Sequence, residues 1–206
     1  MELLKTEIKN EKNDLLKTKM RNEKKQKELY NVAFIGKFAS GKTYFSDMLK
    51  QKLNEKGIES NRVSIAQKIK DLAKDLFDMQ TKDRRLLQNL GAKMREIDKD
   101  VWIKYLIINV KRNSLEPFIV DDVRFVNEYN LIKQSFPNFK VFKITTDEEQ
   151  RLNVYEKLYG RKPTQEEIND PTETDIDNIP FDEILINDYK KETCERIIDE
   201  IIKKYF

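Results

Sequence analysis

The stretch with the clearest chemistry is residues 36–43, which read GKFASGKT. A glycine, four variable residues, Gly-Lys and then serine or threonine form the pattern of a phosphate-binding loop (P-loop). Glycines let the backbone fold around phosphate oxygens, and successive backbone N–H groups present partial positive charge to them. We therefore expect the following eight residues to bind the nucleotide: Gly36, Lys37, Phe38, Ala39, Ser40, Gly41, Lys42 and Thr43.

Two side chains of this loop have expected roles in catalysis. Lys42 would reach the β- and γ-phosphates of ATP, and the hydroxyl of Thr43 would be a ligand of Mg²⁺. The chain contains no histidine, which excludes a histidine general base and a histidine metal site. Catalysis would therefore use lysine, arginine, carboxylates and bound magnesium.

The residues on either side of the loop supply the context that the motif requires. Residues 31–35 form a short apolar run, which is typical of a buried parallel strand. After Thr43 a helical pattern places Phe45, Leu49 and Leu53 on one face and ends at Gly57. A strand before the loop and a helix after it predict a true P-loop.

A second predicted strand, residues 117–121, is apolar up to Val120 and leads into a pair of carboxylates, Asp121 and Asp122. In P-loop proteins such a strand lies beside the first, and its acid supports Mg²⁺ directly or through water. We assign this catalytic and metal-supporting role to Asp122. Arg124 follows two positions later.

The rest of the chain alternates between short apolar runs and helical patterns. Strands are expected at 62–65, 140–144 and 183–186, and helices at 67–79 (with Leu76 and Phe77 inward), 83–95, 100–112, 127–134, 147–158 and 192–205. Strands separated by helices imply a parallel sheet with helices on both faces. The predicted fold class is α/β, a three-layer P-loop fold over residues 29–206, preceded by a charged helical extension over residues 1–28.

Residues 121–128 read DDVRFVNE, which resembles the signature of the phage-type deoxynucleoside monophosphate kinases. A second element, RLLQNLG at residues 85–91, is also similar to that family, including a following arginine, Arg95, and the pair Trp102-Ile103. The stretch 171–175 resembles the family's Ser-Glu segment before the last strand, with threonine in the serine position. The resemblance runs from Tyr30 to the C-terminus.

The resemblance implies roles for residues of the acceptor site. Arg95 and Arg124 would face the acceptor nucleotide and the transferred phosphoryl group, because an arginine fork pairs with phosphate oxygens in a bidentate manner. Gln88, Glu173 and Arg85 (or its neighbour Arg84) would also bind the acceptor. The acceptor-binding region would span about residues 66–112, and Trp102 is expected in the core.

The resemblance also implies a lid over about residues 147–172. Arg151 and Arg161 bracket its helix, and one of them would close over the phosphates; we assign Arg151 to catalysis. Closure would exclude water and so favour transfer over hydrolysis.

We expect an enzyme that uses ATP and Mg²⁺ to phosphorylate a nucleoside monophosphate, in particular a deoxynucleotide. Two alternatives remain open. One is another small P-loop kinase, of the phosphomevalonate or dephospho-coenzyme A type. The other is a nucleotide-binding module without catalysis. The Lys-, Asn- and Ile-rich composition is compatible with a phage or other viral source.

The overall composition indicates which partners and which cellular compartment to expect. Forty basic and 37 acidic residues leave a net charge of +3 spread along the chain, with no basic block that predicts nucleic-acid binding. The single cysteine, Cys194, excludes an intrachain disulfide and fits a reducing compartment. No apolar run approaches the ~18 residues of a membrane span. We expect a cytoplasmic protein (host cytoplasm if viral) without nucleic-acid or membrane partners, in which residues 1–28 leave a homodimer possible.

Overall fold

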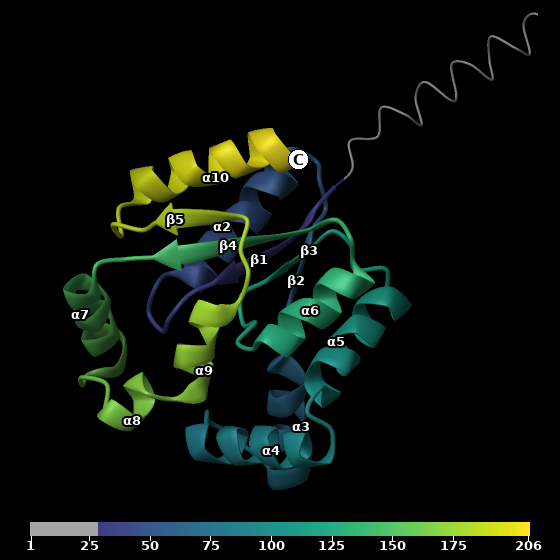
Figure 1. Ribbon diagram of the computed structural model, residues 1–206, viewed down its shortest axis with the longest axis vertical. Coiled ribbons are helices and arrows are strands. Elements are labelled where there is room, and N and C mark those ends of the chain that lie inside the picture. The colour runs from purple at the N-terminus through teal and green to yellow at the C-terminus, as the bar shows by residue number, and fades with distance from the viewer. Residues whose placement is uncertain (1–28) are drawn as a thin grey trace, which may run out of the picture.

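The computed structural model describes residues 29–206, and its five parallel strands form one sheet in the order β2-β3-β1-β4-β5 (Figure 1). The strands are β1 (Asn31–Ile35), β2 (Asn61–Val63), β3 (Phe118–Val120), β4 (Phe139–Thr145) and β5 (Glu183–Ile186). Strand β1 pairs with β3 on one side and β4 on the other, with Val32 opposite Ile119 and Lys140. The carboxyl ends of the three central strands therefore meet at one edge of the sheet, where open α/β folds bind ligands.

Helices connect the strands and cover both faces of the sheet (Figure 1). Their bounds are α2 (Lys42–Glu55), α3 (Gln67–Phe77), α4 (Arg84–Ile97), α5 (Val101–Arg112), α6 (Val126–Ser135), α7 (Glu148–Tyr159), α8 (Gln165–Ile168), α9 (Pro171–Thr174) and α10 (Lys191–Tyr205), with a 3₁₀ turn, η1, at Asp175–Asn178. One core contains α2 and α10, and the other contains α3, α5 and α6. The predicted three-layer α/β architecture is confirmed.

Strand β1 shows how the sequence forms two cores at once. Successive side chains of a strand point to opposite faces of the sheet. Val32 and Phe34 accordingly pack with α2 and α10, whereas Ala33 and Ile35 pack in the other core. All four are fully buried, which explains why the strand reads as a continuous apolar run.

Helix α3 departs from the sequence prediction at its end. It ends at Phe77, and Asp78 follows in the left-handed conformation. Leu76 and Phe77 were predicted to point inward, but 67% and 55% of their surfaces are exposed. Ile69 and Ala73 are the buried residues of this helix, and Leu72 packs against the core partly buried. An apolar pattern over the last turn therefore did not indicate burial.

Trp102 behaves as predicted for a core residue. Its ring is buried, and its indole N–H donates to the carbonyl of Gly91 at 3.1 Å. This bond joins α5 to α4, the helix that carries most of the predicted acceptor-binding residues. The buried tryptophan therefore helps to hold α4 against α5.

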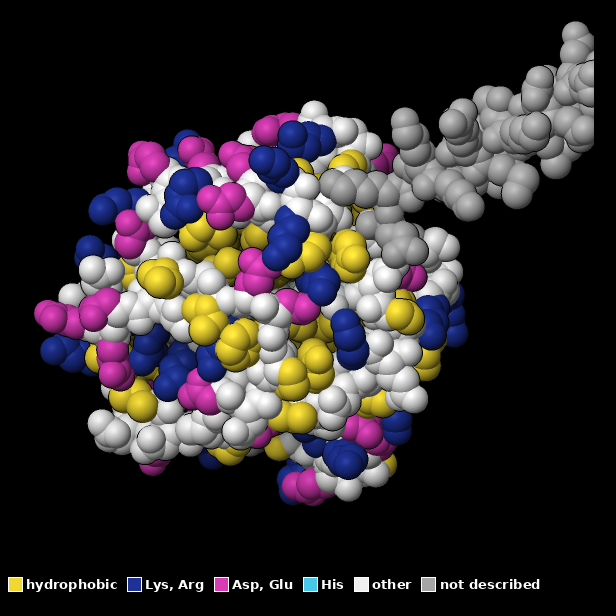
Figure 2. All heavy atoms as spheres, turned by 45° about the horizontal axis from the view of Figure 1, so that its top comes forward, with side chains coloured by type: hydrophobic (Ala, Val, Ile, Leu, Met, Phe, Trp, Pro, Cys, Tyr) yellow, Lys and Arg dark blue, Asp and Glu magenta, His cyan; other side chains and the backbone are white. Residues whose placement is uncertain are grey.

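The outer surface carries charges of both signs. On the face shown in Figure 2, basic and acidic side chains are interspersed with apolar ones. Among residues 29–206, no helix is long and apolar enough to cross a membrane. The predicted extension at residues 1–28 lies outside the described residues.

Candidate active site

The P-loop joins β1 to α2 and adopts a backbone that its glycines make possible. Gly36 and Gly41 have φ angles of 151° and 94°, and Ala39 lies in the left-handed region at 56°. A Cβ on Gly36 would stand 2.6 Å from the carbonyl oxygen of Ile144, and one on Gly41 would stand 2.5 Å from Asn187 Nδ2. Neither position has room for a side chain. The tight turn therefore depends on the two glycines of the motif.

Lys42 lies at the start of α2 and folds back over the loop. Its Nζ donates to the carbonyls of Gly36 and Lys37 at 2.6 and 2.7 Å. The pKa of Lys42 is lowered to about 7, first by burial and next by the positive charge of Arg124, while nearby carboxylates oppose the shift. Phosphate charge at this place would favour the protonated lysine.

The carboxylate beside Thr43 belongs to Asp121, which corrects the assignment of Asp122 to this place. The Thr43 hydroxyl donates to Asp121 Oδ2 at 2.8 Å, and Arg62 Nη2 donates to the same oxygen at 2.8 Å. Asp121 comes directly after β3, the neighbour of β1, so the sheet itself brings the acid to the hydroxyl. A hydroxyl and a carboxylate are ligands that Mg²⁺ accepts alongside waters and substrate phosphates.

Asp122 points to a different partner. Its carboxylate accepts from the hydroxyl of Ser64 at 2.6 Å and from the backbone N–H groups of Ile65 and Ala66 at 2.9 Å each. These bonds fasten the turn that precedes α3. Consecutive residues of an extended segment point in opposite directions, which explains why only one of the two aspartates reaches the P-loop.

No group of three or more His, Cys, Asp or Glu side chains within residues 29–206 is arranged to hold a metal ion. Mg²⁺ held by Thr43 and Asp121 would have phosphate oxygens and water as its further ligands.

The segment after β5 holds the P-loop backbone through side-chain hydrogen bonds. The sequence analysis did not predict this role. Asn187 Nδ2 donates to the carbonyl of Ser40, and the Tyr189 hydroxyl donates to the carbonyl of Ala39, each at 2.9 Å. Asn187 is buried. The only signal in the sequence was a polar Asn-Asp pair directly after a predicted strand.

A cavity of about 860 Å³ lies beside the P-loop, where the acceptor site was predicted. Its walls come from α3, α4, the loop after β3, α6 and the segment around α9. Of the predicted acceptor residues, four line it: Gln88, Arg95, Arg124 and Glu173. Asp122 lines it as well. Arg85 is exposed and is not among the lining residues, and the side chain of Arg84 lies outside the described part of the chain.

Arg124 and Arg95 are both held by buried carboxylates at this cavity. Arg124 Nη1 donates to Glu173 Oε1 at 2.9 Å. Arg95 lies over the ring of Phe125, 5.3 Å from its centre, with its Nη2 3.8 Å from Glu128 Oε1. The two guanidinium groups thus reach the same cavity from different elements.

Glu128 fixes the backbone that carries Arg124. Its Oε2 accepts from the N–H groups of Arg124 and Phe125 at 2.8 and 3.2 Å, which closes the N-terminus of α6. Burial raises the pKa of Glu128 to about 7, although these N–H groups and the charge of Arg95 favour the ionised form. Glu128, the last residue of the DDVRFVNE stretch, therefore holds the loop that presents Arg124, whereas Asn127 donates to Asp100 at 2.7 Å.

Of the two arginines of the predicted lid, Arg151 faces the P-loop. It is buried, and its guanidinium lies over the Phe38 ring at 4.4 Å from the centre. Arg151 and Ser40 line a hollow of about 290 Å³ between the P-loop and the end of β4. Within the described residues, Arg151 Nη1 and Ser40 Oγ are buried without a hydrogen-bond partner. Such orphaned donors cost about 1–3 kcal/mol each, so this hollow is suited to a polar or anionic ligand.

Arg161 stands apart from the site. It is exposed and forms two bonds of 2.8 Å with Glu167, across the turn between α7 and α8. Of the two arginines predicted for a lid, Arg151 is therefore the one that the structure places beside the P-loop.

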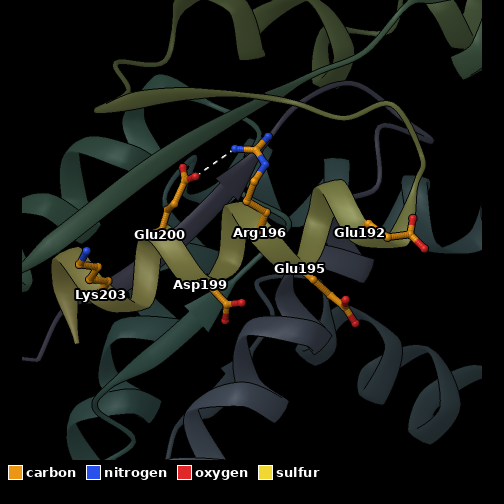
Figure 3. Close-up of a pocket in the computed structure, with 6 residues that line it drawn as sticks. All are labelled: Glu192, Glu195, Arg196, Asp199, Glu200 and Lys203. Atoms are coloured by element: carbon orange, nitrogen blue, oxygen red, sulfur yellow. Dashed lines mark hydrogen bonds and ion pairs between the residues drawn. The ribbon is translucent and has the colours of Figure 1, made fainter.

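A further hollow lies on the outer face of α10. Figure 3 shows that all six lining side chains come from this one helix, and the dashed line marks the Arg196–Glu200 pair at 2.9 Å. Charged residues at this spacing are ordinary for a solvated helix face. None of the lining residues belongs to the P-loop or the acceptor cavity.

The chain matches no protein-family model and no curated protein sequence. Among solved structures, it is similar to shikimate kinase from Acinetobacter baumannii in complex with shikimate, at 12% identity and a TM-score of 0.51 over 86% of this chain and 93% of that one. It is also similar to a putative kinase from Chloroflexus aurantiacus, at 10% identity and a TM-score of 0.52 over 87% of this chain and 99% of that one. A sugar kinase from Janibacter is similar at 12% identity and a TM-score of 0.51, over 85% of this chain and 94% of that one. These likenesses show that the chain has the fold of the small P-loop kinases.

Proposed function

We propose that this protein transfers the terminal phosphoryl group of ATP to the phosphate of a nucleoside monophosphate, with a deoxynucleotide as the expected acceptor. One observation carries the proposal. Arg95 and Arg124 line one cavity, and Glu173, which lines the same cavity, contacts the P-loop directly. Two arginines in a cavity next to a nucleotide cradle suit an acceptor that itself carries a phosphate.

On the donor side, the P-loop amides and Lys42 would hold the phosphates of ATP, and Thr43 with Asp121 would hold Mg²⁺. The metal would neutralise charge on the β- and γ-phosphate oxygens. Arg151, whose Nη1 is buried without a partner in the described structure, would add a positive charge from the lid side. Such a site works by positioning and charge stabilisation, so no covalent intermediate is required.

On the acceptor side, Arg124 would grip the phosphate that receives the phosphoryl group, and Arg95 would hold it from the α4 side. Phe125 and Gln88 offer an apolar ring and an amide for the rest of the acceptor. Glu128 acts indirectly, because it holds the backbone of Arg124. The lid, residues 147–172, would exclude water during transfer.

The alternatives predict other acceptors for the same site. A phosphomevalonate or dephospho-coenzyme A kinase would also need a donor cradle and basic residues. The structural neighbours include a shikimate kinase bound to shikimate and a sugar kinase. Two arginines in the cavity favour an anionic acceptor over a neutral sugar, and a panel of acceptors separates a phosphate from the carboxylate of shikimate.

A panel of acceptors tests the proposal. ADP release from ATP and Mg²⁺ should be measured with the four deoxynucleoside monophosphates, the four ribonucleotides, phosphomevalonate, dephospho-coenzyme A and shikimate. We expect turnover with at least one deoxynucleotide and none with shikimate. The Lys42→Ala variant, purified in parallel, controls for contaminating kinases. Turnover with a different acceptor class alone, or with none, would reject the proposal.

A further inference from the structure

One carboxylate bridges the two halves of the site. Glu173 Oε2 accepts the backbone N–H of Phe38, within the P-loop, at 2.6 Å. Its Oε1 accepts from Arg124 Nη1 at 2.9 Å. Only 7% of Glu173 is exposed. A buried anion thus lies between the nucleotide cradle and the acceptor cavity.

The partners of this carboxylate are groups that bind phosphate. P-loop amides present their N–H groups to phosphate oxygens, and arginine pairs with phosphate as it does with carboxylate. Lys42, which would also bind a phosphoryl group, instead donates to the carbonyls of Gly36 and Lys37. The carboxylate of Glu173 therefore makes two of the contacts that a phosphoryl group would make on its way between donor and acceptor.

We propose that Glu173 stands in for the transferred phosphoryl group when the site is empty, and that the terminal phosphate of the donor displaces it. This inference rests on the proposed function. Two anions cannot share the Phe38 N–H and the Arg124 guanidinium, because like charges at such a distance repel strongly. Donor binding would thus release Arg124 from Glu173 and make it available to the acceptor.

The position of Glu173 allows such a displacement. It lies on α9, a helix of only four residues at the end of the predicted lid. Asp170 fixes this helix by accepting from the N–H and hydroxyl of Thr172, so the turn can move as a unit. Loss of the Glu173 contacts would free α9 from the P-loop and leave it joined to Arg124 by the longer bond from Arg124 Nη1 to the carbonyl of Thr172, at 3.4 Å. The donor would then couple the lid to the acceptor arginine.

The test is a binding titration without acceptor, so that no turnover occurs. The wild type and Glu173→Gln are titrated by calorimetry with Mg²⁺ and either the β,γ-imido analogue of ATP or ADP. We expect Glu173→Gln to bind the triphosphate analogue about tenfold more tightly, the equivalent of one hydrogen bond to a charged group. The affinity for ADP, which has no terminal phosphate at that place, should change much less.

Glu59→Gln is the matched control. Glu59 is exposed, lies before β2 at the far edge of the sheet, and its change removes the same charge. We expect its affinities to equal those of the wild type. Glu173→Ala provides a second variant, and it should also favour the triphosphate analogue.

Two results would overturn the inference. One is equal affinity of the wild type and both Glu173 variants for the triphosphate analogue, with folding confirmed by circular dichroism. The other is tighter binding of ADP by the same factor, because that indicates a general charge effect. Nucleotide binding that responds as expected, together with no turnover on any nucleoside monophosphate, would reject the proposed acceptor while supporting the role of Glu173.

Discussion

The two halves of the candidate site are built in different ways. The P-loop is one continuous segment whose contacts come mainly from backbone atoms, and Lys42 within it is buried against the carbonyls of Gly36 and Lys37. The cavity at the predicted acceptor site is assembled from side chains on several elements, and Gln88 and Arg95 lie on α4 while Arg124 follows β3.

This difference explains which amino-acid substitutions the P-loop and the cavity can each accept. A site made of backbone depends on glycines and on the strand and helix beside it. A site made of separate side chains depends on how the helices pack and can change its ligand through single substitutions. The similar structures fit this contrast, since a shikimate kinase and a sugar kinase share this fold.

The largest expected effect tests the P-loop half. Lys42→Ala should lower kcat by at least ~100-fold, the scale for losing one preorganised charge-stabilising group. The fold should survive, because Lys42 contacts only two loop carbonyls and no apolar core residue is removed. Steady-state turnover and a thermal melt are the measurements, with the exposed Lys56→Ala as control. Near-normal turnover would refute the assignment of the loop.

The next prediction separates the two neighbouring aspartates. Asp121→Asn should raise the Mg²⁺ concentration for half-maximal turnover by about tenfold or more, because it removes the charge beside Thr43. Asp122→Asn should leave that Mg²⁺ concentration nearly unchanged. It should instead lower the free energy of unfolding by about 1 kcal/mol, the scale for losing a helix-capping side chain, because Asp122 holds the turn before α3. Magnesium titrations and urea unfolding of both variants are required. The opposite pattern would restore Asp122 as the metal-supporting residue.

Arg124→Lys tests the acceptor half. A lysine keeps the charge but loses the planar fork that can hold a phosphate in two places. We expect affinity for ATP to stay within about twofold, while kcat/KM for the best acceptor falls by the equivalent of about 1.5–3 kcal/mol. The exposed Arg112→Lys on α5 serves as control. If only thermal stability falls, Arg124 is structural, and Arg95 becomes the main candidate for gripping the acceptor.

The smallest effect is expected from removing residues 1–28. Every P-loop and cavity residue named above lies within residues 29–206, so turnover should change by less than about twofold. Activity assays and size-exclusion chromatography of the shortened chain test this. A large loss of activity at unchanged stability would show that the first 28 residues contribute to the site, and a change in elution volume would indicate a role in self-association.

The sequence by itself determined the donor half of this protein. The P-loop, its flanking strand and helix, and the α/β class follow from local patterns, because backbone contacts and strand burial act over a few residues. The stretch DDVRFVNE also predicted a role for Arg124 at the site. What the glutamate at the end of that stretch does is visible only in the structure. Glu128 there accepts the N–H of Arg124.

Only the tertiary structure decided the contacts between distant segments. It showed that Asp121 and not Asp122 meets Thr43, that Arg151 and not Arg161 faces the loop, and that Glu173 bridges Phe38 and Arg124. It also showed that Leu76 and Phe77 are exposed. These facts depend on which side of a strand or helix a residue faces and on what packs against it. Neighbouring residues of the same type are interchangeable in a sequence pattern, but they point in different directions once the chain is folded.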